Sequence, residues 1–346
     1  MEALGDSRYA PQMRFAPLGA SGQARLAAAH AAIVGCGALG AAQADLLARA
    51  GVGRLTLVDR DYVEASNLQR QRLFDEADAA DALPKAVAAA RRLGRINAEI
   101  TVDARVADLD SDNIARLLAG AEVLLDGTDN FQTRYLLNDF AVARGLPWIY
   151  GAAVGSYGVT FTIRPGATAC LQCIFGPQPA GVTETCETAG VLNWVVDWVA
   201  AQQAGEAIKL LAGAADALRP TLAAADLWRN EYRQLAAPPR DLACPCCAQR
   251  RFAQLEAVPA GATAVLCGRN AVQLNPRQGL LDLATVACRL QPLGRVRQNE
   301  FMLRFTPGMA AAGGLEMTLF PDGRAIIQGT ADPAAARSLY ARYIGA

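Results

Sequence analysis

Short apolar runs alternate with segments of helical spacing over the first 150 residues of the chain. Segments that predict strands lead from Ile33 into Gly35 and lie at residues 55–58, 100–106, 123–125 and 148–150. Between them, helical patterns begin at Ala41 and cover 85–96 and 114–118. A regular alternation of strand and helix is typical of a parallel sheet. After Tyr150 a glycine-rich turn leads into a further strand at 159–163, which predicts antiparallel additions.

This pattern predicts an α/β fold: a Rossmann-like, doubly wound, mostly parallel sheet extended by antiparallel strands, with a small C-terminal α+β domain. We expect a helix from Ala24 and a loop over 74–82. A helix over 194–211 is apolar all round, as in a core or dimer-interface helix, and one strand over 223–234 follows. The predicted division is an N-terminal arm and helix (1–27), a main domain (28–254) and a small domain (262–346).

The small domain follows a predicted linker at 259–261. Its predicted elements are a strand at 263–274, a helix at 281–290, a strand at 300–305, a hairpin at 316–327 and a helix at 333–344. These elements can bury one core, and they contain no recognisable catalytic constellation.

The composition narrows the class of protein. The 346 residues are 52% hydrophobic and carry no net charge at neutral pH, so neither nucleic acid nor an anionic membrane is an expected partner. No apolar run has the length of a membrane span, and the N-terminus lacks a basic region followed by an apolar one. We therefore expect a soluble, cytoplasmic protein.

A glycine-rich turn follows the first strand. Gly35-Cys36-Gly37-Ala38-Leu39-Gly40 allows a tight turn and close approach of the backbone to a phosphate, at the start of a helix. Asp59 ends the next strand, about 20 residues further on, where a carboxylate can accept a hydrogen bond from a ribose hydroxyl. These features predict a nucleotide site. Taken alone, they favour a dinucleotide-dependent oxidoreductase.

The residues after Asp59 favour a triphosphate instead. The segment 66–71, Ser-Asn-Leu-Gln-Arg-Gln, places amides and the guanidinium of Arg70 beyond the carboxyl end of the strand. An arginine offers a planar fork of donors to phosphate oxygens. Lys85, one of only two lysines, follows Pro84 at a predicted helix start, where its ammonium can point at phosphates.

A third segment, Asp126-Gly127-Thr128-Asp129-Asn130, follows a buried strand. Its position is the crevice in which α/β folds bind ligands. We expect Asp126 to be a turn residue or a helix cap. Arg134 and Asn138, in the following helix, are further candidates to line the site.

Two cysteine pairs predict a metal site. The chain has nine cysteines, an odd number, and their clustering argues against a disulfide framework. Cys170 and Cys173 form one C-x-x-C pair, and the second lies about 70 residues later in Cys244-Pro245-Cys246-Cys247. Four thiolates make a closed, structural zinc site. The spacing favours Cys247 over Cys246 as the fourth ligand, but leaves both open.

In their order along the chain, these five motifs resemble those of the adenylyltransferases that activate ubiquitin-like sulfur carriers in thiamine and molybdopterin biosynthesis. Those enzymes are related to the ubiquitin-activating enzymes. The resemblance covers about residues 8–250. It implies that Arg70, Lys85 and Asp129 act in catalysis and that Asp129 holds Mg²⁺. The residues it implies in nucleotide binding are Gly35, Gly37, Ala38, Gly40, Asp59, Ser66, Asn67, Gln69, Arg70, Lys85, Asp129 and Asn130.

The resemblance also implies a mobile crossover loop over 181–190. Its Cys186 would link covalently to the carrier, as in some relatives; the alternative is an idle loop thiol. Relatives carry an arginine where this chain has Pro11, and that arginine reaches the partner subunit's nucleotide site. Here Arg8 or Arg14 could supply the charge.

We therefore expect a homodimeric, ATP-dependent enzyme with Mg²⁺ and Zn²⁺ as cofactors. It would adenylate the C-terminal Gly-Gly carboxylate of a small ubiquitin-like sulfur-carrier protein and release pyrophosphate. The motifs do not distinguish a thiamine-type from a molybdopterin-type carrier. Two alternatives stay open: a non-catalytic nucleotide-binding member of the same family, favoured by Pro11, and an NAD-dependent oxidoreductase.

Overall fold

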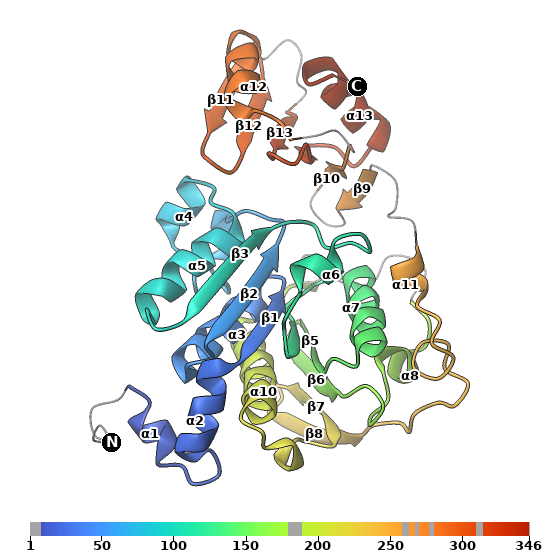
Figure 1. The fold of residues 1–346 in the computed structure, drawn as a ribbon. Helices are drawn as coiled ribbons and strands as arrows, with labels where there is room; N and C mark the ends of the chain where they lie inside the picture. Colours follow the sequence, from blue (N-terminus) through green and yellow to red (C-terminus); the bar gives the residue numbers. More distant parts are fainter. Residues whose placement is uncertain are drawn as a thin grey trace. The chain divides into compact units, whose positions relative to one another are not determined.

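The computed structural model describes residues 8–178, 189–257, 263–266, 270–276, 280–308 and 314–345. The chain forms two compact units, Met1–Ala257 and Val258–Ala346. The first contains an eight-stranded sheet and the second a six-stranded sheet (Figure 1). The loop with Cys186 and the predicted linker at 259–261 lie outside the described residues.

The larger sheet has the strand order β3-β2-β1-β4-β5-β6-β7-β8. Neighbouring strands from β3 to β5 run parallel, and β6, β7 and β8 are added antiparallel, which confirms the predicted fold class. The strands are β1 (His30–Val34), β2 (Arg54–Asp59), β3 (Thr101–Val106), β4 (Val123–Asp126), β5 (Trp148–Val154), β6 (Tyr157–Ile163), β7 (Thr221–Asp226) and β8 (Glu231–Ala236).

Helices cover both faces of this sheet (Figure 1). Because successive side chains of a strand point to opposite faces, Ala31 and Ile33 of β1 pack in one core, and Ala32 and Val34 in the other. The first core holds side chains of α3, α5 and α10, and the second those of α6 and α7. The helices of this unit are α1 (Ala10–Met13), α2 (Gly19–Ala28), α3 (Ala38–Ala50), α4 (Glu76–Ala80), α5 (Lys85–Ile96), α6 (Ile114–Leu117), α7 (Phe131–Arg144), α8 (Leu171–Phe175), α10 (Asn193–Leu211) and α11 (Ala253–Glu256), with 3-10 turns η1 (Ala65–Asn67) and η2 (Ala215–Ala217).

Three local predictions for this unit are wrong. The single strand expected over 223–234 is a hairpin, because Asn230 takes a left-handed conformation (φ 57°) and turns the chain between β7 and β8. The loop expected over 74–82 contains α4, which starts at a capping box of Asp75 and Asp78. The N-terminal helix α2 begins at Gly19, five residues before Ala24.

The second unit packs its own core, in which Leu303, Phe305, Met317 and Ile327 are fully buried. Its sheet order is β11-β12-β13-β14-β10-β9. The strand expected over 263–274 is two antiparallel strands, and β11 was not predicted. The elements are β9 (Thr263–Leu266), β10 (Ala271–Leu274), α12 (Leu283–Leu290), η3 (Gln291–Leu293), β11 (Gly294–Gln298), β12 (Leu303–Pro307), β13 (Glu316–Leu319), β14 (Ala325–Gln328) and α13 (Pro333–Tyr343).

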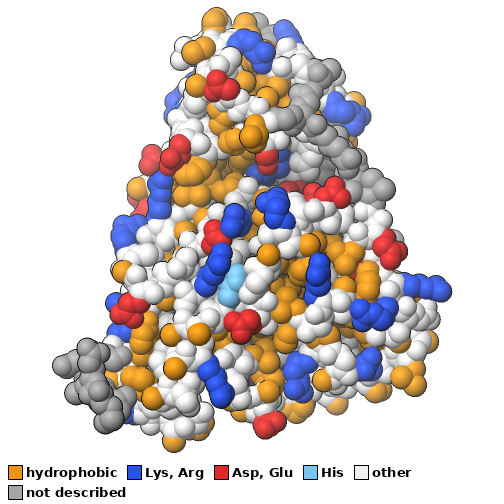
Figure 2. Space-filling model, in the orientation of Figure 1, with side chains coloured by type: hydrophobic (Ala, Val, Ile, Leu, Met, Phe, Trp, Pro, Cys, Tyr) orange, Lys and Arg blue, Asp and Glu red, His pale blue; other side chains and the backbone are white. Residues whose placement is uncertain are grey.

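Within the described ranges, every helix is too short or too polar to cross a membrane. On the face drawn in Figure 2, basic side chains lie singly or in small groups among acidic and apolar ones. This mixture matches the zero net charge of the chain.

The single histidine provides a pH-dependent test of the fold. His30 starts β1, is 7% exposed and shares a hydrogen bond of 2.8 Å with the Thr56 hydroxyl. Burial lowers the pKa of His30, so the unfolded chain, with a pKa of about 6.5, binds the proton more readily. This contribution to stability is present above pH ~6.5 and is lost as the pH falls below it.

We predict that the wild type loses more unfolding free energy than His30→Gln between pH 7.5 and 5.5, measured by urea denaturation. The variant keeps every carboxylate, so the comparison cancels the contribution of their titration. An equal loss in both proteins would contradict the assignment.

Candidate active site and thiolate cluster

The backbone of the glycine-rich turn touches the loop after β4. Gly35 has φ of +86°, and its N–H donates to the Val58 carbonyl (2.8 Å). A Cβ on Gly40 or on Gly127 would overlap the carbonyl oxygen of Gly35. The absence of these side chains brings the start of α3 against residues 126–130, so two of the predicted segments meet at one edge of the sheet.

Asp59 fastens the turn to the end of β2. Its carboxylate accepts hydrogen bonds from the backbone N–H of Cys36 (2.6 Å) and of Asp61 (2.7 Å). Burial raises the pKa of Asp59, although the positive charge of Lys85 opposes the shift. In this structure both carboxylate oxygens accept hydrogen bonds from backbone N–H groups. The contact to a ribose expected of Asp59 stays a prediction.

Lys85 is the first residue of α5 and is buried beside Asp61. Its ammonium lies 3.3 Å from the Asp61 carboxylate, and its backbone N–H donates to the Asp61 carbonyl (2.9 Å). The lysine side chain is only 4% exposed. An ammonium held inside the site, at the start of a helix, is placed to meet an anion.

The segment 66–71 folds as η1 and the turn that follows it. The Asn67 side chain is buried and accepts from the Glu64 N–H (3.1 Å), and Arg70 donates to the Ser66 carbonyl (3.0 Å). The side chains of Ser66 and Gln69 are exposed. Asn67 therefore has a clear role in shaping the turn, and its role toward a nucleotide stays a prediction.

Gln71 is a candidate that the sequence reading did not single out. It is 4% exposed, and its buried Oε1 has no hydrogen-bond partner among the described residues. Its Nε2 lies 3.9 Å from where a Cβ on Gly37 would sit. A buried amide oxygen without a partner among the described residues makes Gln71 a candidate to contact a polar ligand beside the glycine turn. The only available signal in the sequence was its position next to Arg70.

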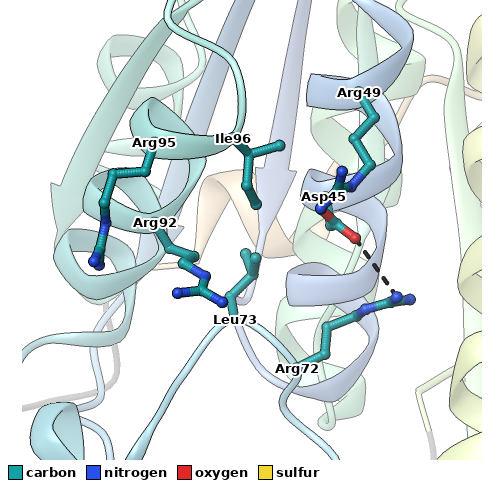
Figure 3. A pocket seen from close by; sticks show the side chains of 7 residues that line it. All are labelled: Asp45, Arg49, Arg72, Leu73, Arg92, Arg95 and Ile96. Carbon is teal, nitrogen blue, oxygen red and sulfur yellow. Dashed lines mark hydrogen bonds and ion pairs between the residues drawn. The ribbon is translucent and has the colours of Figure 1, made fainter.

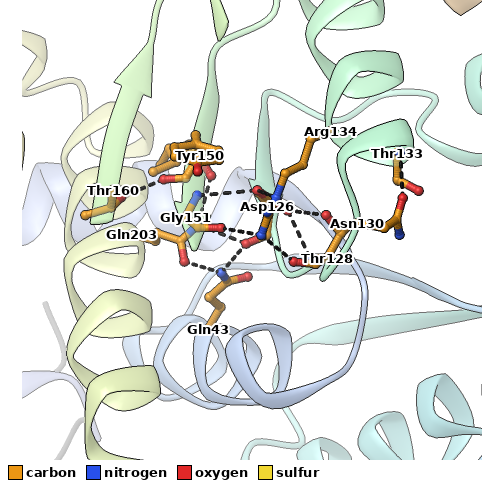
Figure 4. A network of polar contacts seen from close by, with 11 residues as sticks. Gln43, Asp126, Thr128, Asn130, Thr133, Arg134, Tyr150, Gly151, Thr160 and Gln203 are labelled. Atoms are coloured by element: carbon orange, nitrogen blue, oxygen red, sulfur yellow. Dashed lines mark hydrogen bonds and ion pairs between the residues drawn. The ribbon is translucent and has the colours of Figure 1, made fainter. Parts of the chain in front are cut away.

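Asp126 lies at the centre of a buried polar network (Figure 4). Its carboxylate accepts from the Thr128 N–H (2.9 Å) and hydroxyl (2.7 Å), and from Nε of Arg134 (3.0 Å). Arg134 also donates to the carbonyls of Thr128 (2.7 Å) and Gly151 (3.0 Å). Burial disfavours the charged guanidinium, but the nearby Asp126 outweighs it and raises the pKa of Arg134.

The expectation that Asp126 shapes a turn is therefore confirmed, whereas the cap of α7 is Asn130, whose side chain accepts from the Thr133 N–H (2.8 Å). Asp129 lies between them and is exposed. A rigid, buried Asp126 on one side and a helix cap on the other fix the backbone that carries the Asp129 carboxylate.

Two glutamines extend the network to α3 and α10, which lie on the face of the sheet opposite to α7 (Figure 4). Gln43 of α3 donates to the Asp126 carbonyl (2.8 Å) and to Gln203 (2.6 Å). Gln203 of α10 donates to the carbonyls of Asp126 and Ile149 (both 2.9 Å). Sequence reasoning missed both residues, because Gln43 is a lone amide in an Ala-rich helix and Gln203 stands beside Gln202 in a largely apolar one.

Four cysteine sulfurs form a compact cluster. The ligand atoms of Cys170, Cys173, Cys244 and Cys247 all lie within 4.8 Å of one another. Four sulfurs converging from two C-x-x-C pairs are the donor set of a structural zinc site. The geometry therefore fits the expected zinc, and it includes Cys247.

Cys246 lies beside this cluster and interacts with Cys170, but it is not one of the four converging sulfurs. Its buried sulfur accepts from the Asn138 amide (3.2 Å), and the Asn138 carbonyl oxygen accepts from the Leu171 N–H (2.8 Å). Asn138, a candidate to line the nucleotide site, thus joins the two cysteine segments to α7 instead.

A separate groove of about 330 Å³ lies between α3 and α5 (Figure 3). Asp45 pairs there with Arg49 (2.7 Å) and Arg72 (3.6 Å), and Arg72 also pairs with Asp197 (3.4 Å). Because its charges are partly paired and none of the predicted site residues lines it, we assign it no ligand. Its lining residues are Asp45, Arg49, Arg72, Leu73, Arg92, Arg95 and Ile96.

The N-terminal arm distinguishes the two arginines near Pro11. Arg8 is held by Asn97 (2.6 Å) and Glu99 (3.3 Å) within its own chain. Arg14 is exposed and makes no ion pair with any described residue. Of the two, Arg14 is the one whose charge is available to another molecule.

The strand order and the glycine turn define a nucleotide-binding α/β protein. Comparison with known proteins narrows this class. The model of the ThiF family matches residues 9–246, so the chain belongs to the ThiF family.

Two relatives and one solved structure illustrate the similarity. The chain is 45% identical to "Sulfur carrier protein ThiS adenylyltransferase" of Bacillus subtilis, over 98% of this chain and 99% of that protein. It is 36% identical to "Sulfur carrier protein adenylyltransferase" of Thermus thermophilus, over 72% and 95%. The crystal structure of E. coli MccB with MccA-N7isoASN shares the fold, with a TM-score of 0.62 at 23% identity over 70% of this chain and 76% of that one.

The two adjacent cysteines give a matched pair of variants. We predict that Cys247→Ser loses bound zinc, or binds it at least tenfold more weakly, because it removes one of four sulfurs. Cys246→Ser should keep one zinc per chain. The measurement is metal content by atomic emission and zinc release to a chromogenic chelator. Zinc loss in Cys246→Ser with retention in Cys247→Ser would contradict the assignment.

Proposed function

We propose that this enzyme adenylates the C-terminal carboxylate of a small ubiquitin-like sulfur-carrier protein with ATP. The observation that carries the proposal is the 45% identity to the Bacillus enzyme over nearly the whole of both chains. The site residues, set around the glycine turn, suit this chemistry.

The chemistry is a substitution at phosphorus. A carboxylate oxygen of the carrier attacks the α-phosphorus of ATP, the bond from that phosphorus to the bridging oxygen breaks, and pyrophosphate leaves. Backbone N–H groups at the start of α3 would bind phosphate oxygens, and Arg70 and Lys85 would offset the charge that develops. Asp129, which is exposed at the sheet edge, would hold Mg²⁺, which supplies further charge neutralisation when bound.

A ThiS-type carrier is the first candidate. The match to the Bacillus relative extends through the second unit, since it covers 98% of this chain, whereas the match to the Thermus relative covers 72%. A shared second unit is better accounted for by a shared carrier than by the common adenylation chemistry alone. A molybdopterin-type carrier is the alternative to be tested beside it.

We further propose an oligomeric state, a role for Cys186 and a cellular location. A homodimer would let Arg14 act in the partner's nucleotide site in place of the arginine missing at Pro11. Cys186 would form the covalent link with the carrier. Outside the thiolate cluster, Cys36 and Cys288 are free thiols, which persist in a reducing compartment, so the cytoplasm is the proposed location.

We predict ATP–pyrophosphate exchange that depends on a carrier ending in Gly-Gly. Asp129→Ala should lower the exchange rate at least a hundredfold, because it removes the carboxylate that would hold the charge-neutralising Mg²⁺. Asp216→Ala, an exposed aspartate of η2, is the matched control and should exchange normally.

The assay is run with a thiamine-type and a molybdopterin-type carrier, each with and without its terminal glycines. Exchange with one carrier identifies the pathway. If neither carrier supports exchange although ATP binds, the proposal is contradicted and a non-catalytic family member is favoured.

A further inference from the structure

Asp61 holds Lys85 by two separate contacts. Its carboxylate lies 3.3 Å from the lysine ammonium, and its carbonyl accepts the lysine backbone N–H (2.9 Å). Both side chains are shielded, with 15% of the aspartate and 4% of the lysine exposed. The ammonium that the proposed function directs to ATP is therefore already engaged by a carboxylate.

Moving the ammonium toward phosphates would weaken this pair. A shielded carboxylate that loses its counter-ion is destabilised, because the free-energy cost of its desolvation is no longer offset by that ion pair. The penalty would oppose ATP binding directly, because it arises only when Lys85 turns to the phosphates. The site needs a second positive charge near Asp61 if Lys85 is to act on the nucleotide.

Arg60 supplies that charge. Its Nε lies 3.9 Å from the other oxygen of Asp61, and its Nη1 lies 3.0 Å from the Asp108 carboxylate. Asp108 follows β3, so the guanidinium joins the carboxyl ends of β2 and β3. Burial works against its charge, but the carboxylates of Asp108, Asp61 and Asp129 outweigh it and raise the pKa of Arg60. A guanidinium also has enough donors to serve two carboxylates at once.

We propose that Arg60 is a positioning residue that takes over the Asp61 carboxylate when Lys85 turns to the phosphates of ATP. The sequence Asp108, Arg60, Asp61, Lys85 alternates in charge, so a small movement of Arg60 toward Asp61, with Nη1 kept on Asp108, replaces the pair between Lys85 and Asp61. This inference rests on the proposed function.

The competing explanation is that Arg60 touches the nucleotide itself. It follows Asp59 at the carboxyl end of β2, where such folds bind nucleotides. The two explanations differ in what happens when the charge of Asp61 is removed: a counter-ion becomes unnecessary, whereas a nucleotide contact stays lost.

The experiment is a double-mutant cycle in ATP–pyrophosphate exchange, together with binding of a non-hydrolysable ATP analogue. We expect Arg60→Leu to lower kcat/KM for ATP about tenfold to a hundredfold, and Arg60→Lys to recover part of it. Arg60→Leu combined with Asp61→Asn should recover at least fivefold over Arg60→Leu. Arg105→Leu, an exposed arginine of β3, is the matched control and should behave as wild type.

Thermal unfolding midpoints verify that each variant folds, and Arg60→Gln replaces Arg60→Leu if the latter does not. Normal activity in the Arg60 variants overturns the inference, and so does a double variant as impaired as the single one. If the wild type itself lacks exchange with every carrier, the proposed function falls and the inference with it, so the two failures are distinguishable.

Discussion

The site depends on three glycines, from two segments of the chain, whose backbones touch where no side chain could fit. The carbonyl of Gly35 lies against the α-carbons of Gly40 and Gly127, so a methyl group at either position would overlap it. This contact fixes the start of α3 relative to the loop after β4. The helix N-terminus that suits phosphate and the carboxylate of Asp129 therefore belong to one rigid edge of the sheet.

Buried polar groups stabilise this arrangement. Arg134 and Asp126 form an ion pair with 8% and 0% of their side chains exposed, and both are satisfied further by hydrogen bonds to Thr128 and Gly151. Removing one partner of such a pair leaves an uncompensated buried charge, at a cost of about 3–5 kcal/mol. The network thus favours one conformation of the loop and leaves Asp129 exposed beside it.

Features encoded by local spacing could be predicted from the sequence. The glycine turn and each C-x-x-C pair occupy a few adjacent residues, and most strands and helices have a periodicity of their own. The fold confirms the architecture that these features indicate. The hairpin of β7 and β8 was missed because its turn contains neither glycine nor proline and relies on Asn230. Contacts between distant segments could not be predicted: Gln43 and Gln203 meet across 160 positions.

The structure was also needed to assign different roles to neighbouring residues of the same type. The separation of Cys247 from Cys246 follows from which sulfur faces Asn138, a residue more than 100 positions away. Arg60 shows the same limit, since its place between Asp61 and Asp108 follows from the adjacency of β2 and β3.

The most direct measurement of the central claim is a crystal structure with Mg·ATP bound. The account predicts the triphosphate at the start of α3, magnesium on Asp129, and the Lys85 ammonium on a phosphate oxygen, with Arg60 closer to Asp61 than 3.9 Å. A nucleotide bound at another edge of the sheet, or phosphates out of reach of both Lys85 and Asp129, would contradict it.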